Sequence, residues 1–112
     1  MEEEVGLAIA MRIIELDASR WKTSLDFTSA LKIALRAPDW HGSSVNAFVD
    51  SMVTGGVNAV EPPYVVKVVN SDNLDHELLE LIRAVSSAVE RTRLDQLSRT
   101  GDDVAVALEI AD

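Results

Sequence analysis

Asn46 and Asp50 are the polar residues whose type and spacing most clearly suggest a binding surface. They lie four residues apart, so on a helix both side chains project from one face. The apolar residues of this segment fall at helical spacing on another face: Val45, Phe48, Val49 and Met52. A carboxylate on a rigid helix forms charge-assisted, often bidentate bonds with guanidinium groups, and its fixed position limits the entropy lost on docking. An exposed helix aspartate is usually just solvated, so the pattern leaves two readings open: an ordinary solvated Asp50, or a helix that presents Asp50 to a cationic partner.

The residues just before this helix predict a tight turn that orients it. Pro38 ends the preceding helical pattern, because proline has no N–H to donate and disfavours helical angles in the residue before it. Gly42 is expected to permit the turn, and Ser44 has the short oxygen side chain that caps a helix. Trp40 lies on the turn and either contacts a partner or folds inward between two helices. His41 is expected to be solvated unless it has a partner.

The charge distribution restricts the class of partner. The formal net charge is −9, which argues against nucleic acid or an anionic membrane as a direct partner, since both require a basic surface. Residues 39–63 contain Asp39, Asp50 and Glu61 but no Lys or Arg. A negative field of this kind favours a basic protein partner and makes the association rate depend on salt.

Signatures of an enzyme are missing from the sequence. It has two His and no Cys, and it lacks an HExxH motif, a nucleophile elbow and a dinucleotide fingerprint. Gly55-Gly56 is not followed by the Lys and Ser or Thr of a phosphate-binding loop. We therefore expect no catalytic residues, no metal site and no cofactor. A small hydrolase that uses Asp50 and His41 as an acid–base pair is the alternative from this class.

Hydrophobic periodicity and turn signals predict an α/β fold with the order β-α-α-β-α-β. The expected elements are a strand at 11–17, a helix from Thr23 or Ser24 to about Ala37, a helix from Ser44 to about Val53, a strand at 64–70, a helix from about Leu74 to Thr100, with a break at 86–87 or 91–93 left open, and a strand from Val104. Strands separated by helices favour a three-stranded parallel sheet with right-handed crossovers. The β-branched run at 64–69 predicts a central strand covered on both faces.

The 112 residues fit a single domain, with residues 1–10 as an extension that is either partly disordered or an additional strand. The acidic start does not fit a secretory signal, and no apolar run reaches membrane-spanning length. The chain is therefore expected to be cytoplasmic.

The segment 38–50 resembles the characteristic stretch of the barstar family, intracellular inhibitors of barnase-type ribonucleases. That stretch has a proline, two residues, an aromatic residue or His followed by Gly, and then Asn-x-Asp-Ala-x-x-Asp. Its counterparts here are Pro38, Trp40, His41, Gly42, Ser44, Asn46, Ala47 and Asp50. Three positions depart from the pattern: Ser44 replaces an Asn, Asn46 replaces the first helical Asp, and Val49 replaces an aromatic residue.

The resemblance implies a small parallel sheet packed with helices and a protein that inhibits a basic ribonuclease or ribonuclease-type toxin, as an immunity protein or antitoxin does. Asp50 would occupy the place of a substrate phosphate in the enzyme's active site. Trp40, His41 and Asn46 would contact the enzyme, with Gly42 and Ser44 holding the loop. Val49 would either make a smaller contact than the family's aromatic residue or belong to the core, the reading we favour.

A second acidic position of the family falls near Gln96, with Asp95 beside it, when residues are counted back from Gly101. The departures at Asn46 and Val49 also encourage an alternative, a barstar-fold interaction module whose partner is not a ribonuclease.

Overall fold

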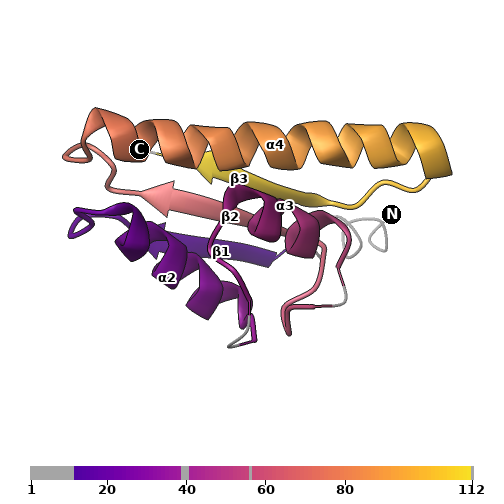
Figure 1. The fold of residues 1–112 in the computed structure, drawn as a ribbon, viewed down its shortest axis with the longest axis horizontal. Coiled ribbons are helices and arrows are strands. Elements are labelled where there is room, and N and C mark those ends of the chain that lie inside the picture. Colours follow the sequence, from indigo (N-terminus) through magenta and orange to yellow (C-terminus); the bar gives the residue numbers. More distant parts are fainter. Residues whose placement is uncertain (1–11, 39–40, 56, 112) are drawn as a thin grey trace, which may run out of the picture.

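In the part of the chain that the structure describes, six elements follow one another in the order β-α-α-β-α-β, as the sequence predicts (Figure 1). The computed structural model describes residues 12–38, 41–55 and 57–111. The elements are β1 (Arg12–Asp17), α2 (Ser24–Leu35), α3 (Val45–Val53), β2 (Tyr64–Val69), α4 (His76–Thr100) and β3 (Val106–Ile110). Met11 and the proposed extension at residues 1–10 lie outside the described residues.

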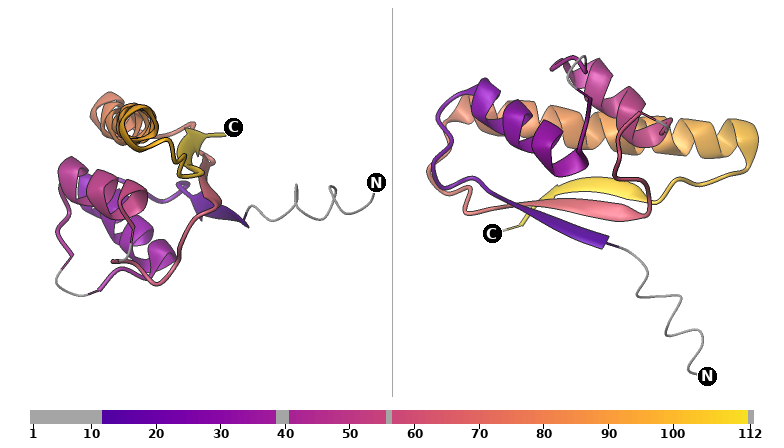
Figure 2. Two further views of the ribbon diagram at one scale, coloured as in Figure 1. Left: turned by 90° about the vertical axis from the view of Figure 1, so that its right-hand side faces the viewer. Right: turned by 90° about the horizontal axis from the view of Figure 1, so that it is seen from below.

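The three strands form one parallel sheet in the order β1-β2-β3. Leu16 pairs with Val68, and Val66 pairs with Leu108. Each crossover therefore moves one strand further in the same direction across the sheet. Because crossovers between parallel strands are right-handed, two successive steps in one direction place their helices on the same face. Figure 2 shows α2, α3 and α4 together on that face.

The expectation that β2 is covered on both faces is wrong. Its side chains alternate: Tyr64, Val66 and Val68 are buried toward the helices, whereas Val65, Lys67 and Val69 on the other face are only partly buried. A β-branched run fits a central strand whether helices cover one face of the sheet or both faces. Which of the two arrangements forms depends on the order in which the strands lie in the sheet.

The core lies between the helical layer and the sheet. Its fully buried side chains come from every helix and include Phe27, Leu31 and Leu35 of α2, Phe48 and Met52 of α3, and Ile82 of α4. Trp21 is half-buried, and its ring lies 5.5 Å from that of Phe27. Its position just after the first strand predicts a residue that covers the core, and the observed packing confirms this.

The helix ends follow local capping chemistry. Thr23 caps α2 in a capping box with Asp26. The spacing of Asp72 and Asp75 is that of a capping box that starts at Asp72. This interpretation is wrong, because Asp75 itself caps α4 by accepting a hydrogen bond from Leu78 N at 2.8 Å. Gly101 ends α4 with φ of 81°, a left-handed conformation that favours glycine.

Helix α4 is continuous and has no break at 86–87 or 91–93. Ser86 Oγ donates to Leu108 O at 2.6 Å, which anchors the helix on β3. The mixed charges along α4 predict a solvated face that includes Arg93. Instead, the Arg93 guanidinium donates to both carboxylate oxygens of Asp103 at 2.7 and 2.9 Å and to Val106 O at 3.2 Å. Arg93 therefore joins α4 to the segment that leads into β3.

Among the described helices, none combines the length and the low polarity that crossing a membrane requires.

Candidate functional site

Helix α3 separates a buried face from an exposed polar face, as its sequence pattern predicts. Ser44 caps the helix, since its hydroxyl accepts from Ala47 N at 3.1 Å. The buried side chains are Phe48, Val49, Ser51, Met52 and Val53. Asn46 and Asp50 are exposed, one turn apart.

Asp50 is held in a defined orientation on the exposed face. Its Oδ1 accepts a hydrogen bond from Thr54 Oγ1 at 3.1 Å, one turn further along the chain. The helix has no basic residue that would neutralise the carboxylate locally. Asp50 thus presents its charge to solvent from a rigid element, which is the geometry that binding a cationic group requires.

The other predicted contact residues in and before α3 differ in where they lie. Gly42 and Ser44 are exposed beside the N-terminus of α3, on the loop that precedes Asn46 and Asp50. Val49 is buried, so the reading of Val49 as a core residue is confirmed. Trp40, together with Asp39, lies outside the described residues.

The loop before α3 does not depend on a glycine-specific conformation at residue 42. The backbone of Gly42 is not in the positive-φ region. A Cβ added there would meet Ala47 Cβ at 3.5 Å, an ordinary van der Waals distance. The expectation that the turn requires glycine is therefore wrong, and an exposed Gly42 leaves room for a close partner instead.

His41 faces the interior, which contradicts the expectation of a solvated loop histidine. Its Nε2 lies 2.9 Å from Ser51 Oγ, and its Nδ1 is hydrogen-bonded to Gly42 O. The imidazole also packs against the ring of Phe48, with centroids 4.9 Å apart. Asn58 Nδ2 donates to Ser51 Oγ at 3.1 Å.

Ser51 and Asn58 were not singled out in the sequence. The available signal was Ser51 itself, a polar residue on the otherwise apolar face of α3.

Asp95 and Gln96 lie near the end of α4, which packs along α3. Asp95 is exposed, and its carboxylate pairs with Arg99 at 2.9 Å. Gln96 is partly buried. An exposed ion pair of this kind contributes little to stability, so Asp95 remains accessible for a partner.

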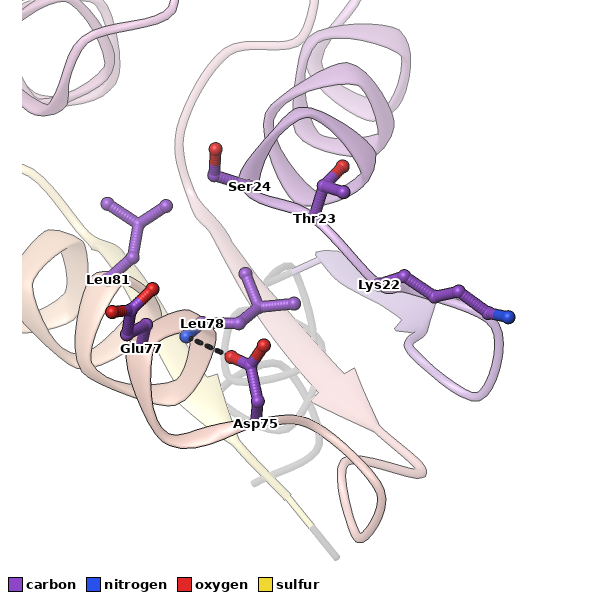
Figure 3. Close-up of a pocket in the computed structure, with 7 residues that line it drawn as sticks. All are labelled: Lys22, Thr23, Ser24, Asp75, Glu77, Leu78 and Leu81. Atoms are coloured by element: carbon purple, nitrogen blue, oxygen red, sulfur yellow. Dashed lines mark hydrogen bonds between the residues drawn. The ribbon is translucent and has the colours of Figure 1, made fainter.

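A pocket of about 320 Å³ lies elsewhere, at the carboxyl ends of β1 and β2, where α2 and α4 begin (Figure 3). Its lining residues are Lys22, Thr23, Ser24, Asp75, Glu77, Leu78 and Leu81. Neither Asp50 nor His41 is among them. His41 is bonded to Ser51 while Asp50 accepts from Thr54, so the geometry gives no support to an acid–base pair. Among the residues that the structure places, no cluster of His, Asp or Glu has the arrangement of a metal site.

Comparison with protein families decides where this chain belongs. The family model described as Barstar (barnase inhibitor) matches residues 11–109, from the start of β1 almost to the end of β3. The chain belongs to the barstar family. A search of curated proteins gives no match. Barstar is a family of inhibitors rather than enzymes, and the order of strands and helices here is consistent with the barstar fold.

Proposed function

We propose that this barstar-family protein binds and inhibits a basic ribonuclease or ribonuclease-type toxin in the cytoplasm of the cell that makes it. The observation that carries the proposal is the exposed carboxylate of Asp50, held on α3 by Thr54. An active site that binds RNA phosphates has basic side chains converging on one point. A fixed carboxylate can take the place of the phosphate there and accept charge-assisted hydrogen bonds from them.

The charges around Asp50 also favour a basic partner. Residues 39–63 carry acidic but no basic side chains, and the stretch includes the whole of α3. This local field attracts a cationic enzyme and raises the association rate, most strongly at low salt.

The neighbouring exposed residues complete the proposed contact surface. Asn46 lies one turn before Asp50 and offers hydrogen bonds without a second negative charge. Gly42 and Ser44 allow the enzyme to approach the loop, and Trp40 is proposed as an aromatic contact beside them. Asp95 and Gln96 are proposed as secondary contacts on α4. His41 acts from beneath this surface, because its ring is buried.

The test is the affinity of Asp50→Ala for a small basic ribonuclease encoded beside this protein. Loss of a charged partner from a buried pair costs about 2 to 5 kcal/mol, so the dissociation constant should rise by a factor of about 30 or more. Glu80→Ala is the matched control, since Glu80 is an exposed acid on α4 and its removal changes the net charge equally. An Asp50→Ala complex as tight as the control complex would show that Asp50 does not occupy the active site.

A second candidate function is a barstar-fold interaction module whose partner is not a ribonuclease. Two observations favour it: Asn46 lacks the charge of the family's aspartate, and Val49 is buried and adds no aromatic contact. Affinity capture with wild-type protein and with Asp50→Ala separates the two candidates. A nuclease that is lost with the variant supports inhibition, and a partner without nuclease activity supports the module.

A further inference from the structure

Three buried polar side chains meet beneath the proposed contact surface. His41 comes from the loop before α3, Ser51 from α3 itself, and Asn58 from the loop after it; each is only 5% exposed. Ser51 Oγ is the centre of the cluster, 2.9 Å from His41 Nε2 and 3.1 Å from Asn58 Nδ2. We call these residues the polar hub.

The hydrogen-bond partners determine which nitrogen of a neutral His41 carries the proton. Gly42 O can only accept, so Nδ1 must donate to it. Nε2 of the neutral ring then has a lone pair, so in this 2.9 Å contact the Ser51 hydroxyl is the donor. Phe48 O, 3.2 Å from Ser51 Oγ, competes for the same hydroxyl proton at the longer distance. Asn58 Nδ2 donates to the same Oγ. When Ser51 donates to His41 rather than to Phe48 O, the hydrogen bonds of the hub all point one way, from Asn58 through Ser51 to His41 and on to Gly42.

The hub is an inefficient way to stabilise a fold. Asn58 Oδ1 is buried and has no hydrogen-bond partner among the described residues. An unpartnered buried acceptor costs about 1 to 3 kcal/mol, whereas apolar side chains of similar volume would carry no such penalty. What the hub provides is directionality, because hydrogen bonds hold only one arrangement of the segments that contribute to them.

The segments that the hub joins are those that frame α3. The backbone N–H of His41 donates to Pro38 O at 3.0 Å, which ties the loop to the segment after α2. On the other side of the hub, Ala59 N donates to Arg36 O at 3.1 Å. The loops before and after α3 are thus both fastened to the end of α2, and Ser51 joins them to α3.

We propose that His41, Ser51 and Asn58 are positioning residues for the binding surface. They hold the loop at 41–44 in one orientation against α3, so that Gly42, Ser44 and Asp50 keep one arrangement before a partner arrives. Fixed presentation reduces the entropy lost on docking, and its loss appears mainly in the dissociation rate. The consequence for binding rests on the proposed function, but the hub itself is testable in the free protein.

The first test is the tautomer of His41, measured by long-range ¹H–¹⁵N correlation in the free protein at a pH where the ring is neutral. The hub requires a protonated Nδ1 and an unprotonated Nε2. A neutral ring protonated at Nε2 would overturn the proposal, because the bond to Gly42 O could not exist.

The second test uses His41→Phe, which keeps a ring against Phe48 and removes both hydrogen bonds. Amide exchange of His41 and Ala59 should accelerate about tenfold in the free protein, because these amides report local opening of the two loops. The amide of Leu79, which donates to Asp75 O in α4, should not change and serves as an internal reference. Equal exchange at residues 41 and 59 in variant and wild type would contradict the proposal.

Binding to the basic ribonuclease gives the third readout. His41→Phe should dissociate about tenfold faster but associate at the wild-type rate within about a factor of two, because no surface charge changes. His41→Gln, whose amide oxygen can accept from Ser51, should recover part of the loss. Unchanged dissociation of His41→Phe, or no recovery by His41→Gln, would refute the positioning role.

Asn58→Leu covers the case in which His41→Phe does not fold. Asn58→Leu removes the unpartnered oxygen and one donor to Ser51, so the amides of residues 41 and 59 should exchange faster than in the wild type while global stability is kept. Exchange at the wild-type rate would refute the role of the hub. If the wild-type protein binds no ribonuclease, the proposed function fails, while the tautomer and the exchange rates still decide whether the hub positions the loops.

Discussion

Replacing Asp50 by Ala should stabilise the free protein, although the same change should weaken binding. Asp50 lies in the last turn of α3, where the partial negative charge of the helix end repels a carboxylate. Its side chain is exposed, and the interaction that the structure gives it is the hydrogen bond from Thr54 Oγ1 at 3.1 Å. The proposed role in binding and the stability of the fold therefore place opposite demands on this residue.

The size of the effect follows from three contributions. Alanine has a higher helix propensity than aspartate by about 0.6 kcal/mol. Removing the charge from the C-terminal turn adds about 0.3 to 0.5 kcal/mol. Loss of the exposed Thr54 bond subtracts about 0.5 kcal/mol. The free energy of unfolding should therefore rise by roughly 0.5 kcal/mol.

The assay is equilibrium unfolding in urea, with Asp75→Ala as the matched control. Asp75 is also an exposed aspartate at a helix end, but it caps the N-terminus of α4 through Leu78 N at 2.8 Å. Its replacement should lower the free energy of unfolding by about 1 kcal/mol. With a urea m-value of about 1.5 kcal/mol/M, the midpoint should rise by about 0.3 M for Asp50→Ala and fall by about 0.7 M for Asp75→Ala. Asp50→Asn keeps an acceptor for Thr54 and isolates the contribution of the charge.

The reasoning would be refuted if Asp50→Ala lowered the midpoint as Asp75→Ala does, at an unchanged m-value. Such a result would mean that Asp50 supports the fold, and that weaker binding by the variant reflects a damaged α3 rather than a missing charge.

Three further predictions concern stability. Gly42→Ala should change the unfolding free energy by less than about 0.5 kcal/mol, whereas Gly101→Ala should lower it by about 1 to 2 kcal/mol because φ is 81° there. The hydrogen bonds from Arg93 lower the pKa of Asp103 below 3.8. The contribution of ionised Asp103 to the free energy of unfolding is therefore present above pH 3.8 and disappears as the pH falls through the folded-state pKa. Asp103→Asn should lower the free energy of unfolding at pH 7 but change it little in strong acid. Burial raises the pKa of Tyr64 from 10.0 to about 12. The contribution of neutral Tyr64 to the free energy of unfolding should therefore be lost between these pH values in the wild type, and this loss should be missing in Tyr64→Phe. Tyrosinate absorbance reports the ionisation directly, because Tyr64 is the single tyrosine.

Local chemistry in the sequence was sufficient to place the secondary structure and the exposed face of α3. Ser44 identified the start of α3 and Gly101 the end of α4, since capping depends on residues only a few positions apart. The separation of Asp50 and Asn46 from the apolar residues of α3 followed from helical geometry alone. These signals need no knowledge of what packs against the helix.

The coverage of the sheet depended on the order of the strands. The β-branched run of β2 is compatible with helices on one face or on both. With the order β1-β2-β3, right-handed crossovers place α2, α3 and α4 on one side. The sequence shows that the strands are separated by helices, but it does not show the direction in which each crossover moves across the sheet.

The surroundings of His41 and Arg93 depended on contacts between residues ten positions apart. His41 meets Ser51 and Arg93 meets Asp103 only because the chain turns between them and packs back. Residue types alone placed both side chains in solvent, since isolated charged and imidazole groups are most stable there. The sequence by itself determined that α3 presents Asp50 to solvent. The tertiary structure decided that a buried histidine lies beneath this surface and joins it to the rest of the fold, because directional hydrogen bonds form only where packing brings donors and acceptors together.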